Sequence, residues 1–154
     1  MTWLAGVDGC PVGWIVALVR PAADEVRIEV VPRFADVLSG ASPAIVAVDI
    51  PIGLPERSGH GGRAAENAVR PLLGARQSSV FSVPSRAAIE ALDYAQACSI
   101  AFATSDPPRR MSKQLFMIAP KIREVDAVLR ADAALRATVF EVGQRHQSIG
   151  HNAV

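Results

Sequence analysis

The chain of 154 residues is poor in cysteine, aromatic side chains and charge, and each shortage excludes a class of protein. Two cysteines, Cys10 and Cys98, cannot build a disulfide framework, and no cysteine and histidine spacing is typical of structural zinc. A charged fraction of 20% beside 50% hydrophobic residues argues against disorder and coiled coils. An aromatic fraction of 5% gives no strong signature of single-strand binding.

Long apolar runs and a basic leader are also missing. The longest apolar stretches, such as Trp14 to Val19, are far shorter than the roughly 20 residues that a bilayer span needs. Residues Met1 to Cys10 lack the basic start of a signal peptide, so we expect a cytoplasmic protein without a membrane partner. The length and composition predict one globular domain over residues 1–142 and a polar tail over residues 143–154.

Charge is unevenly distributed along the chain, although the net charge is only +1. Residues 1–56 carry 3 basic and 7 acidic side chains, residues 57–123 carry 10 and 4, and residues 124–154 carry 3 and 4. A basic middle between acidic flanks is typical of a site where carboxylates hold cations and arginines gather a phosphate-bearing substrate. The alternative is a solvated, arginine-rich surface.

Apolar periodicity in the first third predicts strands and one short helix. Three short β-branched runs, Leu4–Val7, Trp14–Val19 and Val26–Val31, predict an antiparallel meander. Phe34–Leu38 predicts a short helix. The continuous apolar run Ala44–Val48 predicts a strand that lies beside the first strand in a parallel pairing.

The remainder of the chain has helical periodicity. Ile89, Leu92 and Phe102 mark one expected apolar stripe, and Pro120 is expected to start or kink a later helix. Thr138–Val142 predicts a last short strand. The apolar stripe of the later helix has spacings of 4, 3 and 4 and consists of Ile118, Ile122, Val125 and Leu129.

Three carboxylates accompany the predicted strands. Asp8 and Asp49 each follow an apolar run, and Glu141 lies among the apolar residues of the last strand. If the first and fourth strands are neighbours, Asp8 and Asp49 emerge at one edge, where two like charges are costly unless a cation neutralises them. The pattern favours a divalent-metal site formed by Asp8, Asp49 and Glu141. The alternative is that each aspartate only caps a turn.

Four sequence motifs carry a family resemblance. They are Gly6-Val7-Asp8-Gly9-Cys10-Pro11 with Gly13-Trp14; Val48-Asp49-Ile50-Pro51-Ile52-Gly53-Leu54-Pro55; Leu73-Gly74-Ala75-Arg76 with Ser78-Ser79-Val80-Phe81; and Lys121-Ile122-Arg123-Glu124-Val125-Asp126. Over about residues 5–142 the chain resembles the family catalogued as domain of unknown function 429, a predicted ribonuclease H-like nuclease. The resemblance implies an α/β fold, with a mixed five-stranded sheet in the order 3-2-1-4-5 flanked by helices.

The resemblance also implies a chemistry. In ribonuclease H-like nucleases, two Mg²⁺ or Mn²⁺ ions about 4 Å apart promote phosphodiester hydrolysis, and carboxylates hold both ions. Asp8, Asp49 and Glu141 would be the metal ligands and catalytic residues. The expected partner is nucleic acid, and nothing in the sequence distinguishes DNA from RNA.

Arginines in the basic middle are candidates for phosphate binding. Arg63, Glu66 and Arg70 share one helical face by their spacing, with Pro71 ending it, and Arg76 follows. A solvent face with a Glu66–Arg70 ion pair is the alternative. Glu66 stands where the resemblance implies aspartate. The resemblance implies a substrate site formed by Arg63, Arg70, Arg76, Ser78, Ser79, Lys121 and Asp126. For Lys121 and Asp126, the alternative is a pair of residues on the surface of a helix.

The end of the chain departs from the pattern that the resemblance implies. After Glu141 we expect a His-Pro-Glu segment and further helices, whereas residues 142–154 contain no carboxylate and no helical apolar stripe. We therefore expect an uncovered sheet face that a homo-oligomer buries, and weak catalysis unless His146 or His151 supplies a metal ligand. Two alternatives are a catalytically silent nucleic-acid-binding or oligomeric protein of the same fold, and an actin-like or sugar-kinase-type phosphotransferase, which usually needs a second core.

Overall fold

The computed structural model describes residues 2–143, apart from the side chain of Ser79. The described chain divides into two compact units, one containing the residues up to Ile50 together with those from Arg136 onward, and the other containing Pro51–Leu135. His146 and His151 lie outside the described residues, as does the predicted tail beyond Gly143. Within the described range, none of the helices combines the length and apolarity that crossing a membrane requires.

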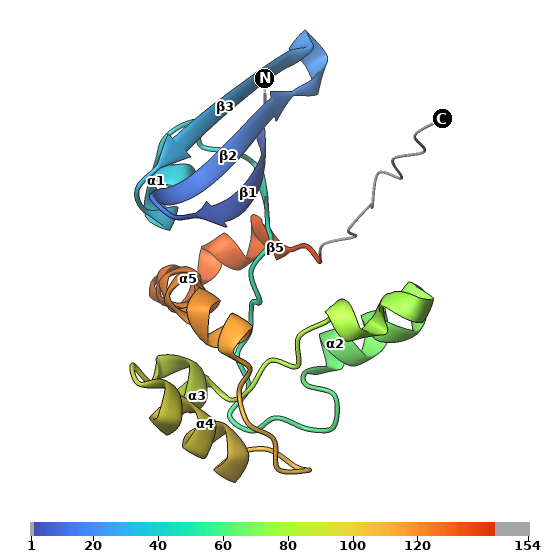
Figure 1. Cartoon of the computed structure of the whole chain (residues 1–154). Helices are drawn as coiled ribbons and strands as arrows, with labels where there is room; N and C mark the ends of the chain where they lie inside the picture. Colours follow the sequence, from blue (N-terminus) through green and yellow to red (C-terminus); the bar gives the residue numbers. More distant parts are fainter. Residues whose placement is uncertain (1, 144–154) are drawn as a thin grey trace, which may run out of the picture. The chain divides into compact units, whose positions relative to one another are not determined.

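The first unit begins with an antiparallel meander of three strands, drawn in blue in Figure 1. The strands are β1 (Leu4–Cys10), β2 (Gly13–Arg20) and β3 (Glu25–Val31), with the short 3₁₀ segment η1 (Pro21–Ala23) before β3. Gly13 has a φ of +149°, and a Cβ there would lie 2.1 Å from the carbonyl oxygen of Val31, so this close approach of β2 and β3 requires glycine. The predicted meander is confirmed, and each strand is slightly longer than expected.

Two further strands complete the sheet. β4 (Ile45–Val48) pairs with β1 in parallel, and β5 (Val139–Glu141) pairs with β4 in parallel. The strand order is β3-β2-β1-β4-β5, as the resemblance implies. The fold is therefore α/β with a mixed five-stranded sheet.

The two faces of this sheet differ in burial. On one face Trp14, Val16 and Val7 are buried, and α1 (Phe34–Ser39) packs there through Phe34, whose ring lies edge-on to Trp14 at 5.1 Å between centroids. On the opposite face six large apolar side chains are between 41% and 64% exposed, whereas Leu4 and Val19 are partly buried. These exposed residues are Ile15, Val26, Ile28, Val30, Ile45 and Phe140.

The second unit is helical. Its elements are α2 (Ala64–Val69), η2 (Arg70–Ser79), α3 (Arg86–Glu90), α4 (Tyr94–Ala103) and α5 (Lys113–Ala131), and η3 (Ala133–Ala137) follows. The side chains of Ser85, Asp93 and Ser112 accept backbone N–H groups at the starts of α3, α4 and α5, which defines these helix boundaries. Helices α3, α4 and α5 pack against one another.

One expected helical stripe is wrong, and the other is confirmed at three of its four positions. Leu92 lies between α3 and α4 and is 80% exposed, and Phe102 is half exposed, so only Ile89 of the first stripe is buried. In α5, Ile122, Val125 and Leu129 are buried as predicted, whereas Ile118, the first residue of that stripe, is only partly buried. Pro120 lies inside α5 and does not start it, because Ser112 already caps the helix.

Candidate functional site

The parallel pairing of β1 with β4 brings two carboxylates to one edge of the sheet. The ladder ends where Val7 is opposite Val48, and the N–H of Asp49 donates to the carbonyl of Val7 at 3.1 Å. Asp8 follows Val7 within β1, and Asp49 is the first residue after β4, so the register places the backbones of these two residues next to each other. Neighbouring strands are about 4.8 Å apart, which allows both carboxylates to contact one small ligand.

Asp8 is held by its local backbone. Strand β1 continues to Cys10, so Asp8 lies within the strand and pairs with Ile15, rather than following the strand as expected. Its Oδ1 accepts the backbone N–H of Gly9 at 2.7 Å, and the side chain is exposed. This bond orients the carboxylate, and it is also compatible with the turn-capping alternative.

Glu141 does not join this pair. The register of β5 places Glu141 opposite Val48, which corresponds to the other face of the sheet from Asp8. Among residues 2–143, no group of three or more His, Cys, Asp and Glu side chains is arranged to hold a metal ion. The register thus separates Glu141 from Asp8, and the role of the three carboxylates as metal ligands stays a prediction.

The chemistry of the remaining donors fits one hard cation. Carboxylate oxygens suit Mg²⁺ and Mn²⁺, and Mg²⁺ is commonly held by one or two carboxylates with water or substrate oxygens completing its shell. Asp8 and Asp49 therefore fit a single ion of this kind. A two-ion site held by three carboxylates does not fit the described arrangement, because Glu141 belongs to the opposite face.

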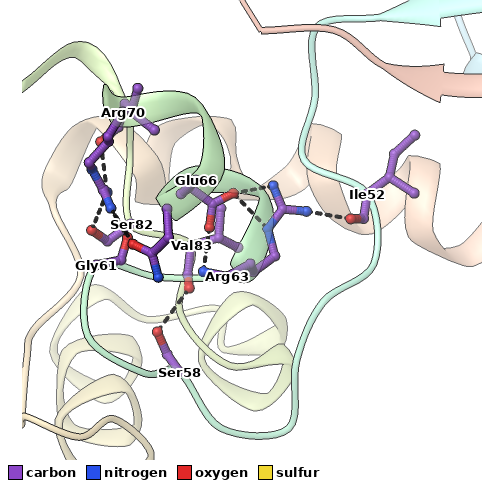
Figure 2. Close-up of polar contacts among 10 residues, drawn as sticks. Ile52, Ser58, Gly61, Arg63, Glu66, Arg70, Ser82 and Val83 are labelled. Atoms are coloured by element: carbon purple, nitrogen blue, oxygen red, sulfur yellow. Dashed lines mark hydrogen bonds and ion pairs between the residues drawn. The ribbon is translucent and has the colours of Figure 1, made fainter. Parts of the chain in front are cut away.

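Arg63 and Glu66 form a buried ion pair at the start of α2 (Figure 2). Their side chains are 8% and 5% exposed, and Glu66 also accepts the backbone N–H of Arg63 at 2.6 Å. The guanidinium of Arg63 donates in addition to the carbonyl of Ile52. The alternative interpretation, a solvent-exposed helix face with a Glu66–Arg70 ion pair, is therefore wrong. Arg63 stabilises the local fold through these contacts.

Arg70 reaches across the glycine-containing loop instead (Figure 2). Its Nη1 donates to the carbonyl of Gly61, and its Nη2 donates to Ser82 Oγ at 2.9 Å. Arg109, from a distant segment, donates through Nη1 to the same Ser82 oxygen at 3.2 Å. Gly61 has a φ of +80°, and a Cβ there would lie 2.6 Å from Arg70 Nη1, so the loop needs glycine at this position. Two guanidinium groups consequently share one hydroxyl.

The other predicted substrate residues have separate surroundings. Arg76 and Ser78 are exposed in η2, and the side chain of Ser79 lies outside the described residues. Asp126 forms an ion pair with Arg86, rather than the surface pair with Lys121 that the alternative predicts. The substrate roles of these residues stay predictions.

Sequence reasoning missed Ser82 and Arg109. The one available signal was the basic dipeptide Arg109-Arg110 directly after two prolines, inside the basic middle of the chain. Nothing in the sequence distinguishes Ser82 from its neighbouring serines. Its position beside Arg70 and Arg109 depends on contacts between residues 12 and 27 positions apart in the chain.

Comparison with known families gives one result. A family model described as "Protein of unknown function (DUF429)" matches residues 6–143. Comparisons with curated proteins and with solved structures gave no match. Because the family model covers most of the sequence, the chain belongs to the DUF429 family.

Proposed function

We propose that the protein is a divalent-metal-dependent nuclease of the ribonuclease H-like type. It would hydrolyse phosphodiester bonds at Asp8 and Asp49, near the carboxyl ends of the neighbouring strands β1 and β4. The observation that carries this proposal is the parallel register that sets Asp8 beside Asp49. Carboxylate oxygens are the ligands that Mg²⁺ and Mn²⁺ prefer, so two adjacent aspartates suit such an ion. The excess of basic residues over positions 57–123 supports a polyanionic substrate.

In this mechanism both aspartates would be ligands of the same metal ion. Asp8, oriented by the N–H of Gly9, and Asp49 would hold Mg²⁺ or Mn²⁺ between them. Such an ion, when bound, makes water more acidic and offsets negative charge on the phosphoryl oxygens. The arginines of the second unit bind the strand through its phosphates, which is a sequence-independent mode of binding.

A cleavage assay with a binding arm tests the proposal. We expect fluorescent DNA or RNA to be cut with Mg²⁺ or Mn²⁺ and to remain intact with EDTA, because the aspartates act through the ion. ATP hydrolysis, measured in parallel, is expected to be absent. Strand binding without cleavage under every metal condition would instead favour the catalytically silent binding protein, and metal-dependent ATP hydrolysis would favour the phosphotransferase.

We further propose that two copies associate through β3. This strand is at one edge of the sheet, and its exposed face carries Val26, Ile28 and Val30. A two-fold axis at Ile28 would pair two copies of β3 in antiparallel fashion, with Arg27 of each copy opposite Glu29 of the other. This pairing satisfies the open edge and joins the two apolar faces.

Light scattering at low micromolar concentration is expected to give the mass of a dimer. Glu29→Lys places like charges opposite each other at two symmetric positions, so the dissociation constant should rise by about tenfold. Glu56→Lys, the same charge change at an exposed residue of the other unit, should leave it unchanged. A monomer at this concentration would show that a second copy does not pair with the β3 edge.

A further inference from the structure

The hydroxyl group of Ser82 has an unusual set of neighbours. Its oxygen accepts from Arg70 at 2.9 Å and from Arg109 at 3.2 Å. A hydroxyl group has two acceptor positions and one proton to donate. Both acceptor positions are taken by cations, and no acceptor for the proton lies among the described residues. The Ser82 hydroxyl can therefore still donate its proton to a ligand.

The arginines around Ser82 are not neutralised. In the described part of the chain, neither Arg70 nor Arg109 forms an ion pair, whereas five other arginines do. Arg110 also has no ion pair among residues 2–143, and it lines the same small cavity as Ser82 and Arg109. Like charges gathered at one place repel one another, and this repulsion favours an anion there. The paired arginines are Arg20, Arg27, Arg33, Arg63 and Arg86.

The cavity beside these groups is small and firmly built. Its volume is about 20 Å³, which is room for one water-sized atom and not for a whole small molecule. Ser105 Oγ accepts the backbone N–H of Arg109 at 2.7 Å and donates to the carbonyl of Ala101 at 2.7 Å. A backbone bridge joins Ser58 to Ser105 and so connects the two loops that line the cavity. One oxygen of a phosphate group can enter this space while the rest of its molecule stays in solvent.

We infer a phosphate-binding site that is formed by Ser82, Arg109 and Arg110. Arg70 positions the Ser82 side chain through its hydrogen bond to the hydroxyl oxygen. The site donates one neutral and two charged hydrogen bonds, a combination that suits the oxygens of a phosphodiester. The phosphate belongs to the backbone of a nucleic-acid strand, and this choice of source rests on the proposed nuclease function. The site lies entirely within the second unit, whereas the aspartate edge belongs to the first.

Binding of a labelled 20-nucleotide strand, measured at several salt concentrations, tests this inference. Arg109→Ala is expected to weaken binding and to lower the salt slope by about 0.7 for a single strand, because one phosphate contact is lost. Ser82→Ala should weaken binding by about tenfold with an unchanged slope, because the hydroxyl is neutral. Ser82→Thr keeps the hydroxyl and should restore binding. Arg130→Ala, an equal charge loss at an exposed position of α5, is the control.

The outcomes separate this inference from the proposed function. If Arg109→Ala behaves like Arg130→Ala in affinity and in salt slope, the phosphate site is wrong even if cleavage persists. If the strand binds with the expected variant effects but is never cut, the site stands and the nuclease proposal fails. If inorganic phosphate alone binds, in an Arg109-dependent way, and no strand binds, the nucleic-acid source of the phosphate is overturned. Thermal melting of each variant verifies that it is folded.

Discussion

Replacing Asp8 or Asp49 with asparagine is expected to lower the rate of strand cleavage by at least about 100-fold. Loss of residues that merely orient a metal ligand already costs about 10- to 100-fold, so loss of a ligand charge should cost at least the upper value. In the Asp8→Asn variant the side-chain amide can still accept the N–H of Gly9, because it retains an oxygen where Oδ1 of Asp8 lies. The local fold should therefore survive this change.

Cleavage rates and strand affinity, measured side by side, check this expectation. Binding of the strand should be largely kept, since the basic residues that gather it are elsewhere in the sequence. Asp24→Asn is the matched control, because it removes an equal charge at an exposed residue with a φ of +48°, which asparagine also tolerates. Normal cleavage by Asp49→Asn would remove Asp49 from the mechanism. An equal loss with Glu141→Gln would restore the three-carboxylate site.

Glu66→Ala is expected to lower the free energy of unfolding by about 3–5 kcal/mol, because it breaks a buried ion pair by removing the carboxylate. Both side chains are less than a tenth exposed, so water cannot replace the lost carboxylate. The change also removes the acceptor of the Arg63 backbone N–H at the start of α2. Urea denaturation at pH 7 measures the loss through the shift of the midpoint.

The chain contains its own control for this experiment. At the start of α1, Asp36 accepts the backbone N–H of Arg33 at 3.1 Å and pairs with its guanidinium, as Glu66 does with Arg63. This second pair is exposed to water, with Arg33 75% exposed, so Asp36→Ala should be far less destabilising. The hydrogen bond from Arg33 lowers the pKa of Asp36, so its contribution is present at pH 7 and is lost only as the pH falls through the folded-state pKa. Equal losses for the two variants would show that burial does not matter here.

The strands were predictable because their side-chain alternation is local information. Val26 to Val31 alternates on an edge strand, and β4 is a continuous apolar run between two neighbours, as parallel strands are. The break between α3 and α4 also has a local signal, because Asp93 has the side chain of a helix N-cap. It was missed because the apolar positions on either side mimic one continuous stripe.

The composition of the site was less predictable, for a different physical reason. Glu141 was expected beside Asp8 and Asp49, but the face that a strand residue occupies depends on its register with the neighbouring strand. A shift by one residue moves a side chain to the other face, and no local pattern in three residues determines that shift. The ion-pair partner of Glu66 was also not predictable from local spacing, because both Arg63 and Arg70 lie within reach of Glu66 along a helix.

The two aspartates obtain their positions over very different chain lengths. Asp8 is placed by the β1–β2 hairpin, whose strands are joined by only Pro11 and Val12. Asp49 is placed by pairing with a strand about 40 positions earlier, and β5 reaches β4 only after the whole of Pro51–Leu135 has intervened. Closing a longer loop carries a larger entropy cost. β5 is also the last strand to be synthesised, so β4 lacks its second neighbour until residues 139–141 are made, whereas the two strands of the hairpin that contains Asp8 are the first to be made.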